Sequence, residues 1–270
     1  MTSELLDLAR TIAVEAGELA LTRKREGVRV VATKSNAVDI VTAADREAEQ
    51  LIRSRIADAR PADGFFGEES GGDSGTSGLT WIVDPIDGTV NFLYGIPHWA
   101  VSIAVVEAAG ASDGPDPQTW RALAGAVVNP AIGEVYTAAD AAGASLNGAR
   151  LELAPAPPFA ESLVATGFVY DEATRAHQGA VAARLVTRVR DIRRLGAASL
   201  DLCAVAAGRV DAYYESSLSP WDHAAGALVA REAGAIVKGW GDDAAGRELI
   251  LAGKPALVPR LEETLRELGY

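Results

Sequence analysis

Residues 81–92 read WIVDPIDGTVNF and place two carboxylates, Asp84 and Asp87, at the end of an apolar strand. Only a Pro-Ile pair separates the two aspartates, and a Gly-Thr pair follows them directly. Neighbouring carboxylates at the end of a buried strand are costly to ionise unless a cation or several hydrogen-bond donors face them. The stretch therefore predicts a site that brings compensating charge to this point of the chain.

The proline between the aspartates predicts that the strand ends at Asp84 and bends, and that a helix or turn begins near Gly88. The bend brings the side chains of Asp84 and Asp87 together and exposes the carbonyl oxygen of Ile86. Mg²⁺ prefers such oxygen ligands, and it completes its shell with water and substrate phosphate. The glycine and the N–H groups of a helix start would favour an anion. The alternative is a polar turn whose aspartates only cap a helix.

Spacing excludes other motifs of this kind. An EF-hand loop alternates acidic or amide groups before its glycine, whereas Val83 and Pro85 occupy those positions here. The Asp-x-Asp-x-Thr pattern of the haloacid-dehalogenase group has one residue between its aspartates, not two. The chain also contains neither a P-loop nor a Gly-x-Gly-x-x-Gly stretch, so nucleotide-loop chemistry is not expected.

The composition bounds the class of protein. With 270 residues, 49% hydrophobic and 23% charged, the chain is expected to fold around a sizeable core. A net charge of -12 without a long basic run argues against nucleic-acid binding. No apolar run reaches the roughly 18 residues of a membrane span, and no signal peptide is found, so a cytoplasmic location is expected. The single cysteine, Cys203, is expected to be a buried apolar residue.

Apolar periodicity predicts a layered α/β architecture with a mixed sheet in the second half. Helices are expected at about 5–23, 44–59, 174–189, 198–207, 222–233 and 257–267. Strands are expected at about 28–32, 39–41, 98–106, 123–128, 134–138, 162–166, 191–194, 211–215, 235–238 and 248–252. Loops are expected at 71–78 and 108–118. The stretch PAPP at 155–158 divides the chain into two halves, about 1–155 and 156–270, of one domain.

Three more carboxylates stand where they could join the site. Glu68 follows an apolar segment much as Asp84 does, while Asp45 and Asp222 each lie at the start of an expected helix. Aspartate is a favoured capping residue, so helix capping is the alternative for the latter two.

Three separated motifs then point to one family. GEES at 67–70, WIVDPIDGTVNF at 81–92 and WDHAAGALVAREAGA at 221–235 closely resemble the inositol monophosphatase family of Mg²⁺-dependent, lithium-sensitive phosphatases. The similarity covers nearly the whole chain, including 34–45 and 193–215. It implies the α+β fold shared with fructose-1,6-bisphosphatase, a five-layered αβαβα sandwich, for a single catalytic domain of residues 1–270.

The resemblance also implies a metal site. Glu68, Asp84 and the carbonyl oxygen of Ile86 would hold one Mg²⁺. Asp84, Asp87 and Asp222 would hold a second, so that Asp84 bridges the two. Four carboxylates would then balance two Mg²⁺, and a phosphate dianion would not be repelled.

The same resemblance assigns the reacting groups. Asp45 with Thr89 would orient and deprotonate a metal-bound water for in-line attack on phosphorus. The main-chain N–H groups of Gly88 and Thr89 would bind phosphate oxygens. Lys34 and Asp39 fall on a hairpin that in the family helps to hold a third Mg²⁺.

The substrate side is implied by further matches. Glu215 resembles the residue that reaches a ring hydroxyl in inositol-specific relatives; the alternative is a surface glutamate at a strand end. Where this chain has Ala197, animal enzymes often have a threonine near the sugar ring, so the preferred alcohol is open. The residues implied to contact substrate are Asp87, Gly196, Ala197, Ala198, Glu215 and Asp222. The histidines, His98, His177 and His223, show no partner pattern.

The function expected from these residues is Mg²⁺-dependent hydrolysis of myo-inositol 1-phosphate or a related sugar phosphate, with two or three Mg²⁺ per site. Alternatives on the same fold are fructose-1,6-bisphosphatase, histidinol-phosphate phosphatase and 3'-phosphoadenosine 5'-phosphate phosphatase activities. A non-enzymatic alternative is binding of a protein partner, since some bacterial members are linked to RNA-processing or transcription complexes. The resemblance also implies a homodimer.

Overall fold

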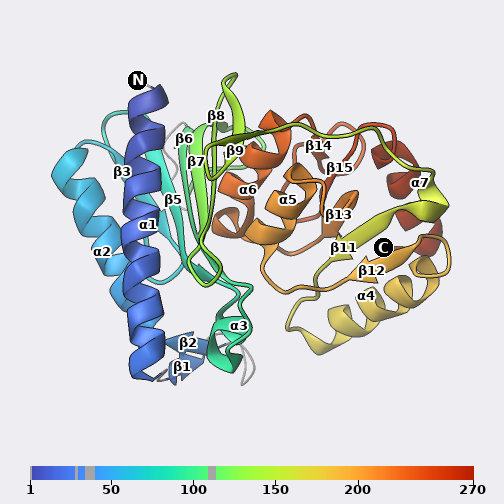
Figure 1. Cartoon of the computed structure of the whole chain (residues 1–270), viewed down its shortest axis with the longest axis horizontal. Helices are drawn as coiled ribbons and strands as arrows, with labels where there is room; N and C mark the ends of the chain where they lie inside the picture. The colour runs from blue at the N-terminus through green and yellow to red at the C-terminus, as the bar shows by residue number, and fades with distance from the viewer. Residues whose placement is uncertain (1, 28–29, 34–39, 109–113) are drawn as a thin grey trace.

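The structure, a computed structural model, describes residues 2–27, 30–33, 40–108 and 114–270. Helices and sheets alternate in five layers across the molecule (Figure 1). The helices are α1 Thr2–Glu26, α2 Ala43–Ala59, α3 Thr89–Tyr94, α4 Glu172–Leu185, α5 Ala198–Ala206, α6 Pro220–Glu232 and α7 Val258–Leu268, with a short 3₁₀ turn η1 at Phe159–Glu161. The expected αβαβα arrangement is therefore confirmed.

The strands form two main sheets and one small hairpin. The first sheet has eight strands in the order β10-β9-β8-β7-β6-β5-β3-β4, and only its β3–β5 pair is parallel. Its strands are β3 Gly64–Gly67, β4 Gly71–Asp73, β5 Leu79–Asp87, β6 Ala100–Glu107, β7 Arg121–Asn129, β8 Glu134–Ala139, β9 Gly143–Leu146 and β10 Ala149–Leu151.

The second sheet is mixed and has five strands in the order β12-β11-β13-β15-β14. Its strands are β11 Leu163–Thr166, β12 Asp191–Arg193, β13 Ala212–Glu215, β14 Ile236–Lys238 and β15 Ile250–Gly253. The small hairpin pairs β1 Val30–Thr33 with β2 Ile40–Thr42 and leads into α2.

Alternation along the strands explains the layering. Trp81, Val83 and Val101 face α1 and α2, whereas Ile82 and Ala104 face α5 and α6. Helices α5 and α6 also pack on the second sheet, whose other face is covered by α4 and α7. Every residue of α5 is buried, as expected for a helix between two sheets. Cys203 lies in this helix and is fully buried, as the sequence predicts.

The aspartate-rich strand differs from the prediction. The strand was expected to end at Asp84, but β5 continues to Asp87 with a shift in its pairing to β6. Asp84 pairs with Ser102 and Asp87 with Ala100, so two residues of β5 stand opposite one residue of β6. This is a β-bulge, and its extra residue returns the two aspartates to the same face of the strand. The bulge at Pro85, rather than a strand end, brings the carboxylates together.

Other local differences are small. Residues 71–73 of the expected loop form β4 because they pair with β3, and the sequence did not indicate β9 and β10. Among the residues that the structure describes, no helix is both long and apolar enough to span a bilayer. Residues 34–39, with the hairpin positions Lys34 and Asp39, and part of the loop at 109–113 lie outside the described residues.

Candidate active site

Sheet topology brings Glu68 and Asp84 to the same edge. Strands β3 and β5 are parallel, so their carboxyl ends meet, and the N–H of Glu68 donates to the carbonyl oxygen of Val83 at 3.2 Å. The side chain of Glu68 contacts the carboxyl of Asp84. Helix α6 packs on the first sheet, and its start lies near these strand ends.

Three carboxylates from two elements converge at this edge. Asp84 and Asp87 of β5 and Asp222 of α6 each present an oxygen, and these oxygens lie within 4.8 Å of one another. Burial raises the pKa of Asp84 and of Asp222 well above the ordinary range, and the charge of Glu68 adds to both shifts. Burial also raises the pKa of Asp87, to about 6. Ionising the cluster without a cation is therefore costly, as the sequence predicts for this stretch.

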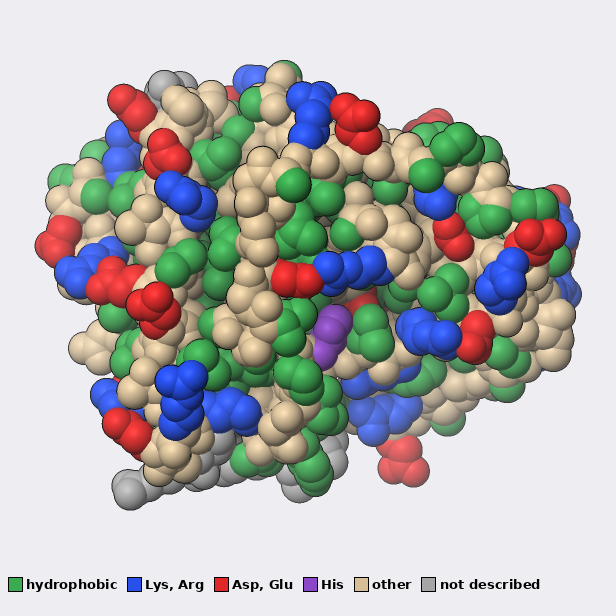
Figure 2. All heavy atoms as spheres, viewed as in Figure 1, with side chains coloured by type: hydrophobic (Ala, Val, Ile, Leu, Met, Phe, Trp, Pro, Cys, Tyr) green, Lys and Arg blue, Asp and Glu red, His purple; other side chains and the backbone are tan. Residues whose placement is uncertain are grey.

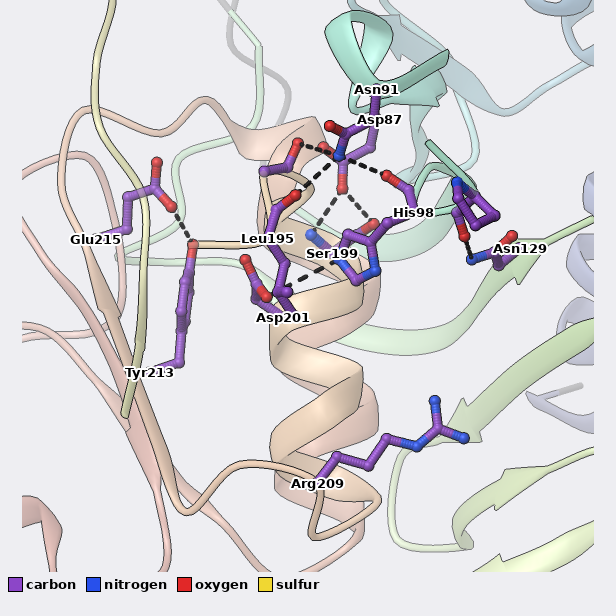
Figure 3. A network of polar contacts seen from close by, with 12 residues as sticks. Asp87, Asn91, His98, Asn129, Leu195, Ser199, Asp201, Arg209, Tyr213 and Glu215 are labelled. Atoms are coloured by element: carbon purple, nitrogen blue, oxygen red, sulfur yellow. Dashed lines mark hydrogen bonds and ion pairs between the residues drawn. The ribbon is translucent and has the colours of Figure 1, made fainter. Parts of the chain in front are cut away.

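Asp87 is held in one orientation by α5. Its Oδ2 accepts hydrogen bonds from the backbone N–H of Ser199 at 2.8 Å and from the Ser199 hydroxyl at 2.5 Å (Figure 3). These bonds lower the pKa of Asp87 and so oppose the effect of burial. They occupy Oδ2, and the backbone N–H of Ala198 also donates to this carboxylate. Sequence reasoning did not select Ser199, although a polar residue in the first turn of an apolar helix was the available signal.

Asp45 serves the helix and the site at once. Its Oδ2 accepts hydrogen bonds from the backbone N–H of Thr42 at 2.9 Å and from the Thr42 hydroxyl, which closes a capping box at the start of α2. Its Oδ1 accepts a hydrogen bond from the hydroxyl of Thr89 at 3.2 Å. The same hydroxyl lies 3.0 Å from the carbonyl oxygen of Ile86. Burial raises the pKa of Asp45 to about 7, which is in the range of a general base at neutral pH.

Asp222 also has two roles. Ser219, not Asp222, is the N-cap of α6, and the backbone N–H of Ser219 donates to Oδ2 of Asp222 at 2.6 Å. Asp222 thus completes a capping box and also belongs to the acidic cluster. Capping and site membership, weighed as alternatives from the sequence, are both satisfied by one side chain.

Gly88 fits a position that other residues do not tolerate. It caps α3 with φ of +86°, and a Cβ placed there would lie 3.1 Å from Ala197 Cβ and 3.1 Å from the carbonyl oxygen of His98. The left-handed conformation and the close approach both require glycine. The 195–198 segment is therefore packed directly against the turn that follows Asp87.

A buried amide fixes the same two segments. The side-chain amide of Asn91 in α3 donates to the carbonyl oxygens of His98 and Leu195, each at 2.8 Å (Figure 3). The second contact joins residues 104 positions apart in the sequence. Asn91 was not selected from the sequence, because its partners are backbone atoms that only the fold brings near.

Glu215 is buried rather than exposed at the strand end. Tyr213, two residues earlier on β13, donates its hydroxyl to Oε2 of Glu215 at 2.6 Å (Figure 3). Burial raises the pKa of Glu215 to about 7, and this hydrogen bond and the charge of Arg194 lower it. The charges of Asp87 and Asp222 also act on Glu215, so its carboxylate lies within electrostatic range of the acidic cluster.

Of the histidines, none joins the cluster of three carboxylates. His223 is buried, its pKa is lowered to about 4 by burial, and its ring lies 5.7 Å from that of Trp120. Nε2 of His98 lies 4.0 Å from Oδ1 of Asp201, and neither atom has a hydrogen-bond partner among the described residues. On the face drawn in Figure 2, basic side chains are scattered among acidic ones and form no continuous field.

The donor set fits a hard divalent cation. All three clustered groups offer carboxylate oxygens, and the structure describes no thiolate or imidazole among them. Oxygen donors of this kind suit Mg²⁺, Ca²⁺ or Mn²⁺ better than softer metals. The raised pKa values of these carboxyl groups reflect burial and mutual repulsion, which such an ion would offset.

Comparison with known proteins agrees with this geometry. The sequence model of the inositol monophosphatase family matches residues 1–268. An inositol-1-monophosphatase of Mycobacterium leprae is 39% identical over 98% of this chain and 94% of that protein. The Nus factor SuhB of Vibrio cholerae is 36% identical over 98% of this chain and 97% of that protein. The crystal structure of the extragenic suppressor protein suhB from Bartonella henselae superposes with a TM-score of 0.87 at 35% identity, covering 99% of this chain and all of that one.

Proposed function

Because the chain belongs to the inositol monophosphatase family, we propose that it is a Mg²⁺-dependent phosphomonoesterase acting on myo-inositol 1-phosphate or a related sugar phosphate. The family is one of metal-dependent phosphatases, and its substrates are phosphate esters. The observation that carries the proposal is the convergence of Asp84, Asp87 and Asp222 from separate parts of the chain. Clustered carboxylates of this kind are costly to ionise together unless a cation offsets their charge.

We assign the metal ligands from the matched motifs. Glu68, Asp84 and the carbonyl oxygen of Ile86 would hold one Mg²⁺, and Asp84, Asp87 and Asp222 the other. The contact of Glu68 with Asp84 and the oxygens within 4.8 Å support this division. Bound Mg²⁺ would neutralise charge on the phosphoryl group and lower the pKa of water. Lys34 and Asp39 belong to the same proposal as contributors to a third ion.

The chain's own groups have distinct tasks. Asp45 accepts a proton from the attacking water, since its pKa of about 7 suits a general base. The hydroxyl of Thr89 fixes Oδ1 of Asp45 and so sets the direction from which the proton is taken. The N–H groups of Gly88 and Thr89, free of helical acceptors at the start of α3, bind phosphate oxygens. The attack is in line and leaves no covalent intermediate on the protein.

We assign the alcohol part of the substrate to residues of the 196–198 segment and to Glu215. Gly196 and Ala197 lie beside Gly88, the backbone of Ala198 donates to Asp87, and Glu215 is within electrostatic range of the cluster. Asp87 and Asp222 complete this set. A hydroxyl is absent at Ala197, and Ser199, which follows shortly after, directs its hydroxyl to Asp87 instead. Glu215 is therefore the side chain that we expect to read the hydroxyls of the alcohol.

Three further properties belong to the proposal: inhibition by lithium, a cytoplasmic location and a homodimer. The dimer is supported by two exposed large apolar side chains, Tyr94 at the end of α3 and Ile96 in the loop that follows. Asn129 donates to the carbonyl oxygen of Pro97 at 3.1 Å, which places the β7–β8 turn and its exposed Ile132 beside that loop. A second copy would cover this apolar surface.

Phosphate release from a panel of esters tests the proposed function. The panel contains myo-inositol 1-phosphate, fructose 1,6-bisphosphate, histidinol phosphate and 3'-phosphoadenosine 5'-phosphate, each with Mg²⁺ or with EDTA. We expect the inositol ester to have the highest kcat/KM and EDTA to abolish all turnover. A clear preference for another ester would replace the substrate, and turnover in EDTA would contradict the metal dependence.

Mg²⁺ is expected to raise the melting temperature more at pH 8.5 than at pH 5. The pKa of Asp87 is raised from 3.8 to about 6, and burial and the charge of Glu68 also raise those of Asp84 and Asp222. In the metal-free protein the folded state therefore holds more protons than the unfolded state above pH 4, and stability falls as pH rises through this window. At low pH, Mg²⁺ must displace protons from the carboxylates and binds weakly. At high pH the carboxylates are already ionised, so Mg²⁺ binds more tightly and stabilises the folded state more.

Differential scanning fluorimetry with Mg²⁺ or EDTA across this range provides the measurement. The lowered pKa values of His98 and His223 give the opposite trend, stability rising with pH, but they act in both series. The Mg²⁺-induced increment therefore isolates the acidic cluster. An increment that is the same at both pH values would contradict the assignment.

Binding of a protein partner is a second candidate, because one relative at 36% identity is named a Nus factor. The net charge of -12 argues that such a role would act through a protein surface rather than directly on nucleic acid. A variant without turnover that still supports the cellular role would favour this candidate.

A further inference from the structure

Tyr213 and Glu215 form a buried pair on one face of β13. Residues two apart on a strand share a face, and here the tyrosine hydroxyl donates to Oε2 of Glu215 at 2.6 Å (Figure 3). Tyr213 is fully buried and Glu215 is 8% exposed. Burying a carboxylate is costly without donors, and this hydroxyl is the hydrogen-bond donor that the described residues give to Glu215.

Gly167 fixes the Glu215 carboxylate from a second side. A Cβ built on Gly167 would lie 1.9 Å from Oε2 and 2.1 Å from Oε1, so the carboxylate rests directly against the glycine backbone. The hydrogen bond from Tyr213 then decides which oxygen is occupied. Oε1 accepts no hydrogen bond from any residue that the structure describes, and it is the oxygen left for a ligand.

The charges around the pair explain why a neutral donor matters. Arg194 attracts the Glu215 carboxylate from an exposed position, whereas the charges of three acids repel it, namely Asp87, Asp201 and Asp222. Asp201 is a second buried carboxylate near this pair, and its Oδ1 has no hydrogen-bond partner among the described residues. The Tyr213 hydroxyl donates to Glu215, and so it holds this carboxylate rather than Asp201 in a defined place.

We propose that Tyr213 is a positioning residue for substrate choice: it holds Oε2 of Glu215 so that Oε1 accepts a hydroxyl from the alcohol part of the phosphate ester. The inference rests on the proposed function and deepens it. Phosphate esters of polyhydroxylated rings are favoured over esters whose alcohol offers no hydroxyl. Tyr213 itself does not touch the substrate.

Tyr213→Phe tests the proposal with two substrates, myo-inositol 1-phosphate and 4-nitrophenyl phosphate, in Mg²⁺. We expect KM for the inositol ester to rise roughly tenfold, as for the loss of one positioned hydrogen bond, with kcat little changed. Both constants for the nitrophenyl ester should be unchanged, because its alcohol offers no hydroxyl to Oε1. The control is Tyr214→Phe, which removes a hydroxyl from the opposite face of the same strand and should alter neither substrate.

Gly167→Ala provides a second variant. Its φ is not in the left-handed region, so alanine is compatible with the backbone, but the new Cβ must displace the Glu215 carboxylate. The same selective rise in KM for the inositol ester is expected. Gly179→Ala in α4, where a Cβ would meet nothing within 4 Å, is the matched control.

Equal losses on both esters, or an unchanged KM for the inositol ester in Tyr213→Phe, would overturn the inference. Calorimetric binding of myo-inositol 1-phosphate in the presence of Mg²⁺ separates this failure from failure of the proposed function. If the wild type releases no phosphate from any ester, the proposed function is wrong, and a roughly tenfold weaker Kd in Tyr213→Phe still supports the positioning role. An unchanged Kd, or no binding to the wild type, overturns it.

Discussion

Asp87→Asn is expected to remove most Mg²⁺-dependent turnover while making the metal-free protein more stable. The amide oxygen of asparagine can replace Oδ2 and keep both hydrogen bonds from Ser199. The amide NH₂ then takes the place of Oδ1 in a group that lies beside Asp84 and Asp222, and an NH₂ cannot coordinate a cation. A loss of about 1,000-fold in kcat/KM, or about 4 kcal/mol, is expected if one of two metal ions is lost.

The metal-free variant is expected to be more stable because asparagine cannot ionise. Burial raises the pKa of Asp87 from 3.8 to about 6, so its ionisation at pH 8 without metal destabilises the fold by on the order of 3 kcal/mol. Asparagine removes that term. The melting temperature in EDTA should therefore rise, and the increment produced by Mg²⁺ should shrink.

Asp201→Asn is the matched control. Asp201 is 1% exposed and its pKa is raised by burial, but it is not among the three clustered carboxylates. This variant should also melt at a higher temperature in EDTA, and it should keep most of its turnover and its full response to Mg²⁺. Wild-type turnover of Asp87→Asn at saturating Mg²⁺ would contradict the metal assignment, as would a lower melting temperature in EDTA.

The convergence of Asp84 and Asp87 could be predicted from the sequence, but its cause could not. Pro85 indicates an interruption of regular pairing, and two adjacent carboxylates indicate a shared ligand. Whether the strand ends or bulges depends on Ser102 and Ala100 of β6, which continue the pairing past the proline. That partner strand is specified elsewhere in the chain, so local sequence could not distinguish the two geometries.

Residues that support the site were harder to predict than residues within it. Glu68, Asp45 and Asp222 stand at ends of apolar or helical segments, where a carboxylate attracts notice, and the structure places all three around β5. The contacts of Asn91 and Ser199 join residues 104 and 112 positions apart in the sequence. Local sequence patterns cannot predict contacts over such separations. Their roles follow from the packing of α3 and α5 against the same turn.

The role of Tyr213 could be predicted only in part from the sequence. The spacing of two from Glu215 on a strand places both side chains on one face, and this pattern is visible in DAYYE at 211–215. The pattern does not show that Glu215 is buried, because its carboxylate packs against Gly167, which follows β11 and is distant in the sequence. Glutamate at a strand end is exposed in most folds, so the sequence left the surface alternative open.

Thr89→Val is expected to lower kcat by roughly 100-fold, the scale of a lost contribution to general base catalysis. Valine keeps the branched shape of threonine at the start of α3 but has no hydroxyl to donate. Oδ1 of Asp45 then loses the contact at 3.2 Å, while Oδ2 keeps its hydrogen bonds from Thr42. Asp45 would remain buried and basic, but the direction in which it accepts a proton would no longer be fixed.

The matched variant is Thr89→Ser, which retains the hydroxyl between Asp45 and the carbonyl oxygen of Ile86 and should recover most of the lost rate. Steady-state kinetics in saturating Mg²⁺ give kcat for the two variants, and thermal melting verifies that each is folded. Each variant should lower the unfolding free energy by only about 1 kcal/mol, because valine replaces the hydroxyl of Thr89 and serine removes its methyl group. A valine variant with wild-type kcat would show that the Thr89 hydroxyl does not orient Asp45, and a serine variant as slow as valine would show that the hydroxyl alone is not sufficient to orient it.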